Sequence, residues 1–179
     1  MNCPLSLAYF KKDVLIVAPD LVGKYLVVQK QDNAIERFII TETEAYRGEE
    51  DLACHASKGL TKRTEIMYRE GGHIYVYMIY GMYWMLNVVT GKINEPHAVL
   101  IRGIEGYNGP GKLTKALHID GSYNGKLLNQ ATGIWIEESG IKPELKTATR
   151  IGVDYAGEIW KNKPWRFILK KNENTNRNN

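Results

Sequence analysis

Cysteine is scarce in this chain of 179 residues, and its scarcity excludes two kinds of structure. Cys3 and Cys54 form no CxxC pair and no disulfide-rich pattern, which favours a reducing compartment and argues against a thiolate metal site. The histidines share no ligand spacing such as HxxxH, and neither a Walker motif nor a Rossmann fingerprint is present, so the sequence predicts no metal and no cofactor. The four histidines are His55, His73, His97 and His118.

Long apolar runs are missing as well. No stretch approaches the roughly 20 residues of a membrane span, and the N-terminus lacks a basic region followed by a long apolar core. We therefore expect a soluble, intracellular protein (cytoplasm, nucleoid or nucleus) with no membrane partner, and a monomer because no long apolar stripe is evident. Lysine and arginine outnumber the acidic residues by 24 to 20, and the net charge of +4 permits an anionic partner without requiring one.

The most informative stretch runs from His73 to Asn87 and reads HIYVYMIYGMYWMLN. Its first half alternates two sets of β-forming side chains, as a strand with two different faces does. Gly81 then permits a turn, and a β-rich run resumes at Trp84. We therefore predict a hairpin with Tyr80 at or near its tip. Aromatic side chains within strands usually belong to the core, whereas a ring at a turn suits a wedge or a stacking platform.

Short β-rich runs alternate with short helical segments along the rest of the chain. We predict strands at 25–28, 38–45, 98–102 and 134–137 and helices at 14–22, 61–69 and 112–117. Hairpins with interspersed helices predict an α+β fold rather than a parallel βαβ sheet. The length fits one domain, which we place at residues 1–169. The remainder, 170–179, is rich in Asn and Lys and is predicted to be disordered.

The segment ETEAY carries two carboxylates on a strand that is otherwise apolar. Glu42, Glu44 and Tyr46 point to one face of that strand. Because buried carboxylates need partners, two interpretations stay open: a solvated strand face, or a general base held by an arginine beside an aromatic wall. Arg102 ends an apolar strand and is a suitable partner, although a strand-end arginine can equally reach solvent. His55 follows an acidic loop and fits a structural hydrogen-bonding group as well as a functional one.

Several motifs, in this order along the chain, resemble one known family. They are ETEAY (42–46), YVYMIYGMYWMLN (75–87), VLIRG (99–103) and NGPGKLTKAL (108–117). From about residue 10 to about residue 167 the chain resembles the alkyladenine (3-methyladenine) DNA glycosylases, or methylpurine glycosylases. The resemblance implies an α+β domain with a curved antiparallel sheet, surrounding helices and a protruding hairpin that intercalates in DNA. It also implies an enzyme of base-excision repair that flips alkylated or deaminated purines out of double-stranded DNA and hydrolyses the N-glycosidic bond.

The same resemblance assigns roles to individual residues. Glu44 matches the general base that activates the attacking water, and Arg102 matches the arginine that helps to hold that water and the carboxylate. Tyr80 matches the residue at the hairpin tip that intercalates where the flipped nucleotide was. Asn87 matches the pocket residue that is thought to clash with the amino group of guanine. The base-binding pocket as a whole is matched by Tyr46, His55, Tyr77 and Asn87.

Two other functions stay open from the residues themselves. A non-catalytic module could stack single-stranded bases on the tyrosine hairpin, although a carboxylate in its groove would repel phosphate. A carbohydrate hydrolase could use Glu42 and Glu44. Such residues on one strand lie only about 7 Å apart at their Cα atoms, however, and their parallel side chains do not flank the glycosidic bond to be cleaved. The motifs place no lysine as a Schiff-base nucleophile, so we predict a monofunctional enzyme that leaves an abasic site.

Overall fold

The longest element of the fold is the 13-residue strand β2 (Ile35–Arg47), and the sheet extends from it on both sides. The computed structural model describes residues 3–170, in which nine strands form an antiparallel sheet with the order β3-β4-β5-β2-β1-β7. The short β6 pairs with β5, and β9 pairs with both β2 and β8. The other strands are β1 (Tyr25–Gln29), β3 (Ile74–Ile79), β4 (Tyr83–Thr90), β5 (His97–Ile104), β6 (Tyr107–Asn108), β7 (Ile134–Glu137), β8 (Leu145–Ala148) and β9 (Arg166–Leu169).

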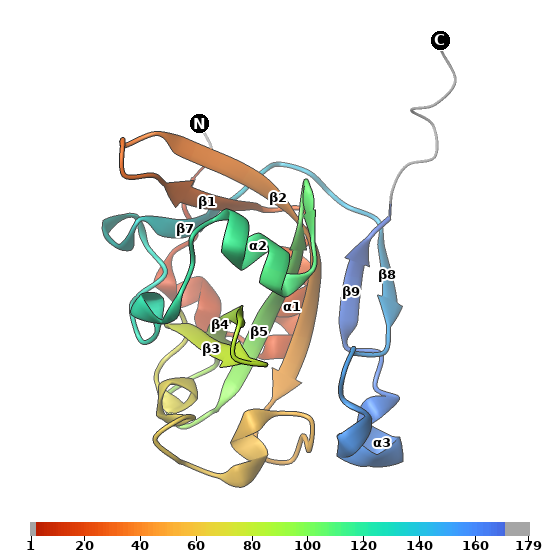
Figure 1. Ribbon diagram of the computed structural model, residues 1–179. Helices are drawn as coiled ribbons and strands as arrows, with labels where there is room; N and C mark the ends of the chain where they lie inside the picture. Colours follow the sequence, from red (N-terminus) through yellow and green to blue (C-terminus); the bar gives the residue numbers. More distant parts are fainter. Residues whose placement is uncertain (1–2, 171–179) are drawn as a thin grey trace.

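Three α-helices accompany the sheet within the described residues: α1 (Val14–Leu21), α2 (Pro110–Ala116) and α3 (Gly157–Lys161). Figure 1 shows α1 and α2 beside the central strands, whereas α3 lies with β8 and β9 next to β2. The sheet and its helices form one domain of the α+β class, as the sequence predicts. In residues 3–170 no helix has the length and apolar character needed to traverse a bilayer.

Helix α1 begins where the sequence predicts. Asp13 caps it, since its Oδ1 accepts a hydrogen bond from the Leu15 N–H at 2.8 Å. The helix ends one residue before the predicted end, where the Val22 N–H bonds to the carbonyl of Pro19. One face of α1 is apolar and packs into the main core, and its buried residues are Val14, Val17, Ala18 and Leu21.

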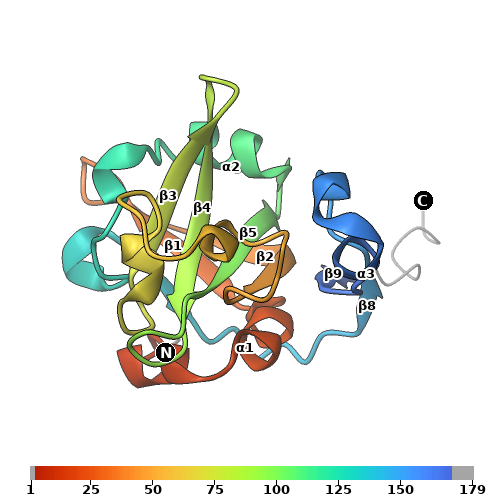
Figure 2. The same cartoon turned by 90° about the horizontal axis from the view of Figure 1, so that it is seen from below.

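The predicted hairpin is formed by β3 and β4. The two strands pair antiparallel from Ile74↔Val88 to Ile79↔Tyr83. One face of the hairpin packs into the main core, and the opposite face presents tyrosines to a second, smaller cluster. Figure 2 shows the tip extending beyond the other elements, and β4 continues the sheet by pairing with β5. A two-sided strand pattern thus produces a hairpin that is anchored at its base and free at its tip.

One predicted helix is wrong. Residues 61–69 do not form an α-helix, and only a single 3-10 turn, Glu65–Tyr68, is present. The reason is that threonine hydroxyl groups compete with the backbone hydrogen bonds of a helix. The Thr61 N–H donates to Thr64 Oγ1 at 2.8 Å, and the Thr64 hydroxyl donates to the carbonyl of Gly59. These bonds fold the segment into a tight turn before a helical hydrogen-bond ladder can start.

Smaller differences concern the ends of elements. Helix α2 begins at Pro110, two residues before the predicted start, because a proline is well suited to the first helical position. Strand β2 is longer than predicted at both ends, with a register irregularity around Glu42. The predicted disordered tail, 170–179, lies outside the described residues except for Lys170.

Candidate active site

A cavity of about 400 Å³ opens between β2, the hairpin, β5 and the segment that follows β8. Aromatic rings and a few polar side chains line it, as in many ligand sites. Every site residue expected from the sequence contributes to this lining, namely Glu44, Tyr46, His55, Tyr77, Tyr80, Asn87 and Arg102. In residues 3–170 there is no group of three or more His, Cys, Asp or Glu side chains that could hold a metal ion, either in this cavity or outside it.

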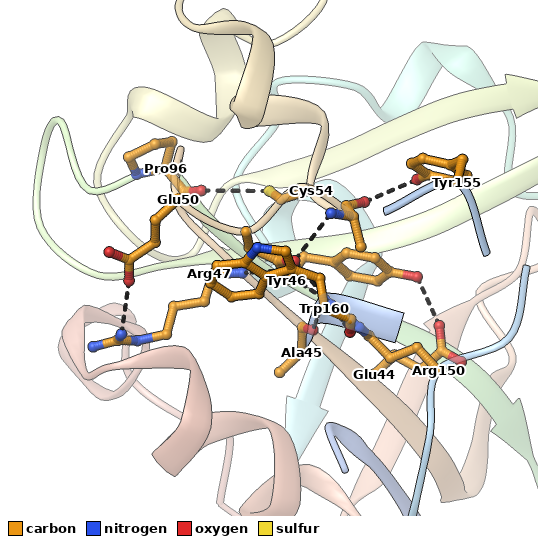
Figure 3. A network of polar contacts seen from close by, with 12 residues as sticks. Glu44, Ala45, Tyr46, Arg47, Glu50, Cys54, Pro96, Arg150, Tyr155 and Trp160 are labelled. Carbon is orange, nitrogen blue, oxygen red and sulfur yellow. Dashed lines mark hydrogen bonds and ion pairs between the residues drawn. The ribbon is translucent and has the colours of Figure 1, made fainter. Parts of the chain in front are cut away.

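Glu44 is fully buried at the cavity wall, and both of its carboxylate oxygens are engaged. The Tyr46 hydroxyl donates to Oε2 at 2.8 Å, and the Ile151 backbone N–H donates to Oε1 at 2.9 Å. Figure 3 shows Tyr46 pointing its hydroxyl at Glu44. Burial raises the pKa of Glu44, while Arg102 and these two hydrogen bonds oppose the rise. The solvated-face interpretation is therefore wrong for Glu44.

Arg102 lies between two carboxylates rather than beside one. Its Nε is 3.1 Å from Glu42 Oε1 and 3.6 Å from Glu44 Oε1. Glu42 is also mostly buried and receives a second bond, from Arg166 Nη1 at 2.9 Å. The expected pairing of Arg102 with Glu44 is present, but Glu42 is the nearer partner. Arg102 does not extend into solvent, since its side chain is only 16% exposed.

Three aromatic rings form a continuous wall of the cavity. The His55 and Tyr77 ring centroids are 4.5 Å apart, and those of Tyr75 and Tyr77 are 5.3 Å apart. The guanidinium of Arg63 lies over the Tyr77 ring at 5.3 Å. Burial raises the pKa of Tyr77, so its hydroxyl stays protonated. The wall therefore offers flat, electron-rich faces together with the Tyr75 hydroxyl, which His55 holds in place.

His55 is neutral in this setting. Burial lowers its pKa to about 4, and the charge of Arg63 adds to the effect. Its Nδ1 lies 2.9 Å from the Tyr75 hydroxyl. A neutral imidazole with one nitrogen engaged in this way has a defined orientation, and the other ring nitrogen is available to a ligand.

Asn87 lies on β4 and is 2% exposed. Its side-chain Nδ2 donates to the carbonyls of Tyr75 and Met85, at 3.2 Å in each case. These bonds fix the amide in one position at the wall of the cavity. A ligand that approaches Asn87 therefore meets a rigid group.

Tyr80 occupies the hairpin turn, as predicted, and its side chain is 86% exposed. Its backbone φ is 51°, an uncommon value for a residue that is not glycine. Gly81 follows with φ 68°, and Met82 beyond it is also exposed. The tip thus presents a large apolar ring that is not part of any core and that lies at the mouth of the cavity.

Three residues that shape the site were not expected from the sequence. Tyr75 orients His55, Ile151 holds Glu44 through a backbone N–H, and the hydroxyl of Tyr155 donates to the Ala53 carbonyl across the cavity rim at 3.0 Å. A backbone donor leaves no signal in the side-chain pattern. The tyrosines do not differ in sequence from those used for packing, and only their distances to partners distinguish them.

Comparison with known proteins identifies the family of this chain. A model of the methylpurine-DNA glycosylase family matches residues 8–108 and 105–173. A protein of Psychrobacter cryohalolentis named "Putative 3-methyladenine DNA glycosylase" is 43% identical over 84% of this chain and 85% of its own length. A protein with the same name from Legionella pneumophila (strain Corby) is 44% identical over 92% of this chain and 93% of its own length. Another, from Methanocella arvoryzae, is 42% identical over 90% of this chain and 90% of its own length. The chain described here therefore belongs to the methylpurine-DNA glycosylase family.

Proposed function

We propose that this chain is a monofunctional DNA glycosylase that removes alkylated or deaminated purines, 3-methyladenine among them, from double-stranded DNA. The observation that carries the proposal is the fully buried carboxylate of Glu44, which is held by three partners beside an aromatic cavity. Family membership shows the class of reaction, which is hydrolysis of an N-glycosyl bond in DNA.

The size of the cavity supports base flipping. Its volume of about 400 Å³ is at the lower end of the range of small-molecule pockets, roughly 300–1,000 Å³. Such a cavity holds a single base but not a duplex, so the target base has to leave the stack, at a cost of a few kcal/mol. Tyr80 is placed to offset part of that cost, because an exposed ring at the mouth of the cavity can fill the gap that the base leaves.

Glu44 carries the chemistry in this proposal. As a carboxylate it takes a proton from the attacking water, and its negative charge stabilises the oxocarbenium-like transition state at the sugar. Arg102, the Ile151 N–H and the Tyr46 hydroxyl favour the charged form of Glu44 against the effect of burial. No proton donor is needed for a cationic purine such as 3-methyladenine, which is already a good leaving group.

The aromatic wall supports the choice of substrate. A cationic purine is attracted to an aromatic face such as that of Tyr46 or Tyr77 by about 1–2 kcal/mol when both partners are desolvated. The guanidinium groups of Arg150 and Arg63 already lie over these two rings and reduce that gain. His55 is neutral and so does not repel that cation. The Nε2 atom of His55, which has no hydrogen-bond partner among residues 3–170, can form a hydrogen bond with an edge of the base. Neutral lesions such as hypoxanthine gain less from this wall and depend more on such hydrogen bonds.

The absence of a suitable lysine supports a monofunctional reaction. Within the described part of the chain, no lysine lines the cavity. We therefore expect duplex DNA containing hypoxanthine or 3-methyladenine to lose the base while both strands stay intact until alkali is added. The measurement is gel analysis of a labelled duplex with and without alkali, together with treatment by borohydride. Strand breaks without alkali, or a borohydride-trapped covalent adduct, would contradict the proposal.

Asn87 is proposed to exclude guanine-type bases: its fixed amide lines the cavity, where it would clash with the additional amino group of such a base. Asn87→Ser makes room there, so release of guanine-type bases relative to hypoxanthine should rise about tenfold, the effect of about 1.4 kcal/mol. Single-turnover release from matched duplexes measures the ratio. Thr90→Ser, a buried substitution on the same strand, should leave it unchanged. An unchanged ratio in Asn87→Ser would remove Asn87 from this role.

Both alternative functions lose support from the geometry. A module that only binds DNA gains nothing from a buried carboxylate at its base-binding wall, and desolvating such a group is costly. A carbohydrate hydrolase needs two carboxylates that flank the bond to be cleaved. Glu42 and Glu44 instead both contact the Nε of one arginine, Arg102, so this function is disfavoured.

A further inference from the structure

We propose that Arg150 is a positioning residue for this reaction: it fixes the segment after β8 so that the Ile151 N–H stays on Glu44. The proposal rests on the role proposed above for Glu44. Arg150 does not line the cavity, and it acts through its neighbour in the chain.

Arg150 ties together parts of the chain that are distant in sequence. Its guanidinium forms a two-bond ion pair with Asp51, with Nη2 2.8 Å from Oδ1, and neither side chain is exposed. It also donates to the carbonyls of Ala45 at 2.9 Å and Trp160 at 3.1 Å. One side chain therefore joins β2, the loop after β2, and α3. Figure 3 shows Arg150 beside Glu44.

The same guanidinium supports an aromatic ring of the pocket. It lies 4.9 Å from the centroid of Tyr46 and 5.1 Å from that of Trp165. Tyr46 in turn donates to Glu44. Arg150 thus supports two of the groups that hold the Glu44 carboxylate, the Tyr46 hydroxyl and the Ile151 N–H.

The Ile151 N–H belongs to a segment without regular structure. Residues 149–153 belong to neither a strand nor a helix, and Gly152 within them has φ 76°. Backbone outside regular structure is positioned by the contacts of the segment itself. Here Arg166 donates to the Thr149 carbonyl at 2.7 Å and Val153 packs into a small apolar cluster, while Arg150 anchors the residue directly before Ile151. Without Arg150 the segment can move, and the hydrogen bond to Glu44 Oε1 lengthens. Asp51 would then also be left buried without its cation.

Loss of Arg150 changes the titration of Glu44 in a known direction. Six titratable or charged side chains face Glu44: Arg102 on β5, Glu42 and Tyr46 on β2, Tyr77 on β3, Arg150 after β8, and Arg166 on β9. Arg166 is the residue opposite Glu44 in the β2–β9 pairing. Burial already raises the pKa of Glu44, and the Ile151 N–H opposes the rise. Removing that N–H and a nearby cation raises the pKa further. Because the base must be ionised, activity is then lost at a higher pH than in the native chain.

The test measures single-turnover release of hypoxanthine from a defined duplex as a function of pH. Arg150→Met should lower the rate at pH 7 about 100-fold, as expected when a reacting group is misplaced by about 1 Å. The acidic limb of the pH profile should move to higher pH, while affinity for a duplex with an abasic site changes less than about threefold. Arg150→Lys keeps the charge and should recover part of both effects. Asp51→Asn is a second variant of the same ion pair and should move the limb in the same direction.

Arg37→Met is the control for the loss of an arginine from a buried carboxylate far from the site, although the Arg37 side chain is 40% exposed and that of Arg150 is not exposed. Arg37 also pairs with a buried carboxylate, Glu137, at 2.8 Å, but it lies seven residues from Glu44 along β2, roughly 23 Å away. Thermal unfolding compares the stability of all variants. An acidic limb that stays in place in both Arg150→Met and Asp51→Asn, or rate losses no greater than in Arg37→Met, would overturn the inference. Glu44→Gln in the same assay separates the two proposals: full activity of that variant would sink the role of Glu44 itself.

Discussion

Glu44→Gln should abolish base release while leaving DNA binding intact or tighter. Glutamine has nearly the shape of glutamate and can still accept a hydrogen bond from Ile151 or Tyr46, but it takes no proton from water and carries no charge to stabilise the oxocarbenium-like state. General-base catalysis alone contributes about 10²–10⁴-fold, so we expect a rate loss of at least 1,000-fold, roughly the middle of that range. Removing a negative charge from a site that approaches phosphate should not weaken binding. Duplex affinity by fluorescence anisotropy, with single-turnover release, measures both effects.

Glu42→Gln is the control for this substitution. Glu42 lies on the same strand and contacts the same arginine, yet it lines a different cavity and has Arg166 as a second partner. Its loss leaves Arg102 next to Glu44, so we expect release to stay within about tenfold of native, a change of about 1.4 kcal/mol. Equal losses in Glu42→Gln and Glu44→Gln would mean that the arginine network, rather than a base at Glu44, limits the reaction.

Tyr80→Ala should weaken duplex binding and base flipping while sparing the chemistry. The ring is 86% exposed and held by no core contact, so its removal costs little stability. Stacking of an aromatic side chain on a base contributes about 1–3 kcal/mol, so affinity for a lesion-containing duplex should fall about 5- to 150-fold. Release from a substrate with the damaged base already extruded should stay close to native.

The comparison of these two substrates is the test of the wedge. Binding is measured on a lesion-containing duplex, and single-turnover release on that duplex and on a bulged strand. Tyr80→Phe keeps the ring and should behave like the native chain on both. Equal losses on both substrates in Tyr80→Ala would contradict the wedge role, because a wedge is not needed when the base is already out of the stack.

The hairpin and the ETEAY strand show what a local pattern can predict. Strand periodicity places Tyr77 on the face opposite Ile74, and the turn residues place Tyr80 at the tip, because both signals lie within a few residues of each other. The sequence also predicts one face shared by Glu42 and Glu44. It does not predict how they share Arg102, because the β2–β5 pairing is irregular around Glu42.

The parts that could not be predicted depend on long-range contacts. Asp51 and Arg150 are 99 residues apart in the sequence, and no spacing rule links them. The Ile151 donor is a backbone group that any residue type would supply. The error at residues 61–69 has a different origin, since a threonine that is able to cap a helix instead folds a turn through Thr64.

The most direct test of the account is single-turnover release of hypoxanthine from a defined duplex by the native chain and by Glu44→Gln, with each sample divided for alkali treatment. We expect release by the native chain only, with strand breaks that appear only after alkali. Release by Glu44→Gln at the native rate would contradict it. So would a native chain that binds the duplex but releases neither hypoxanthine nor a methylated purine.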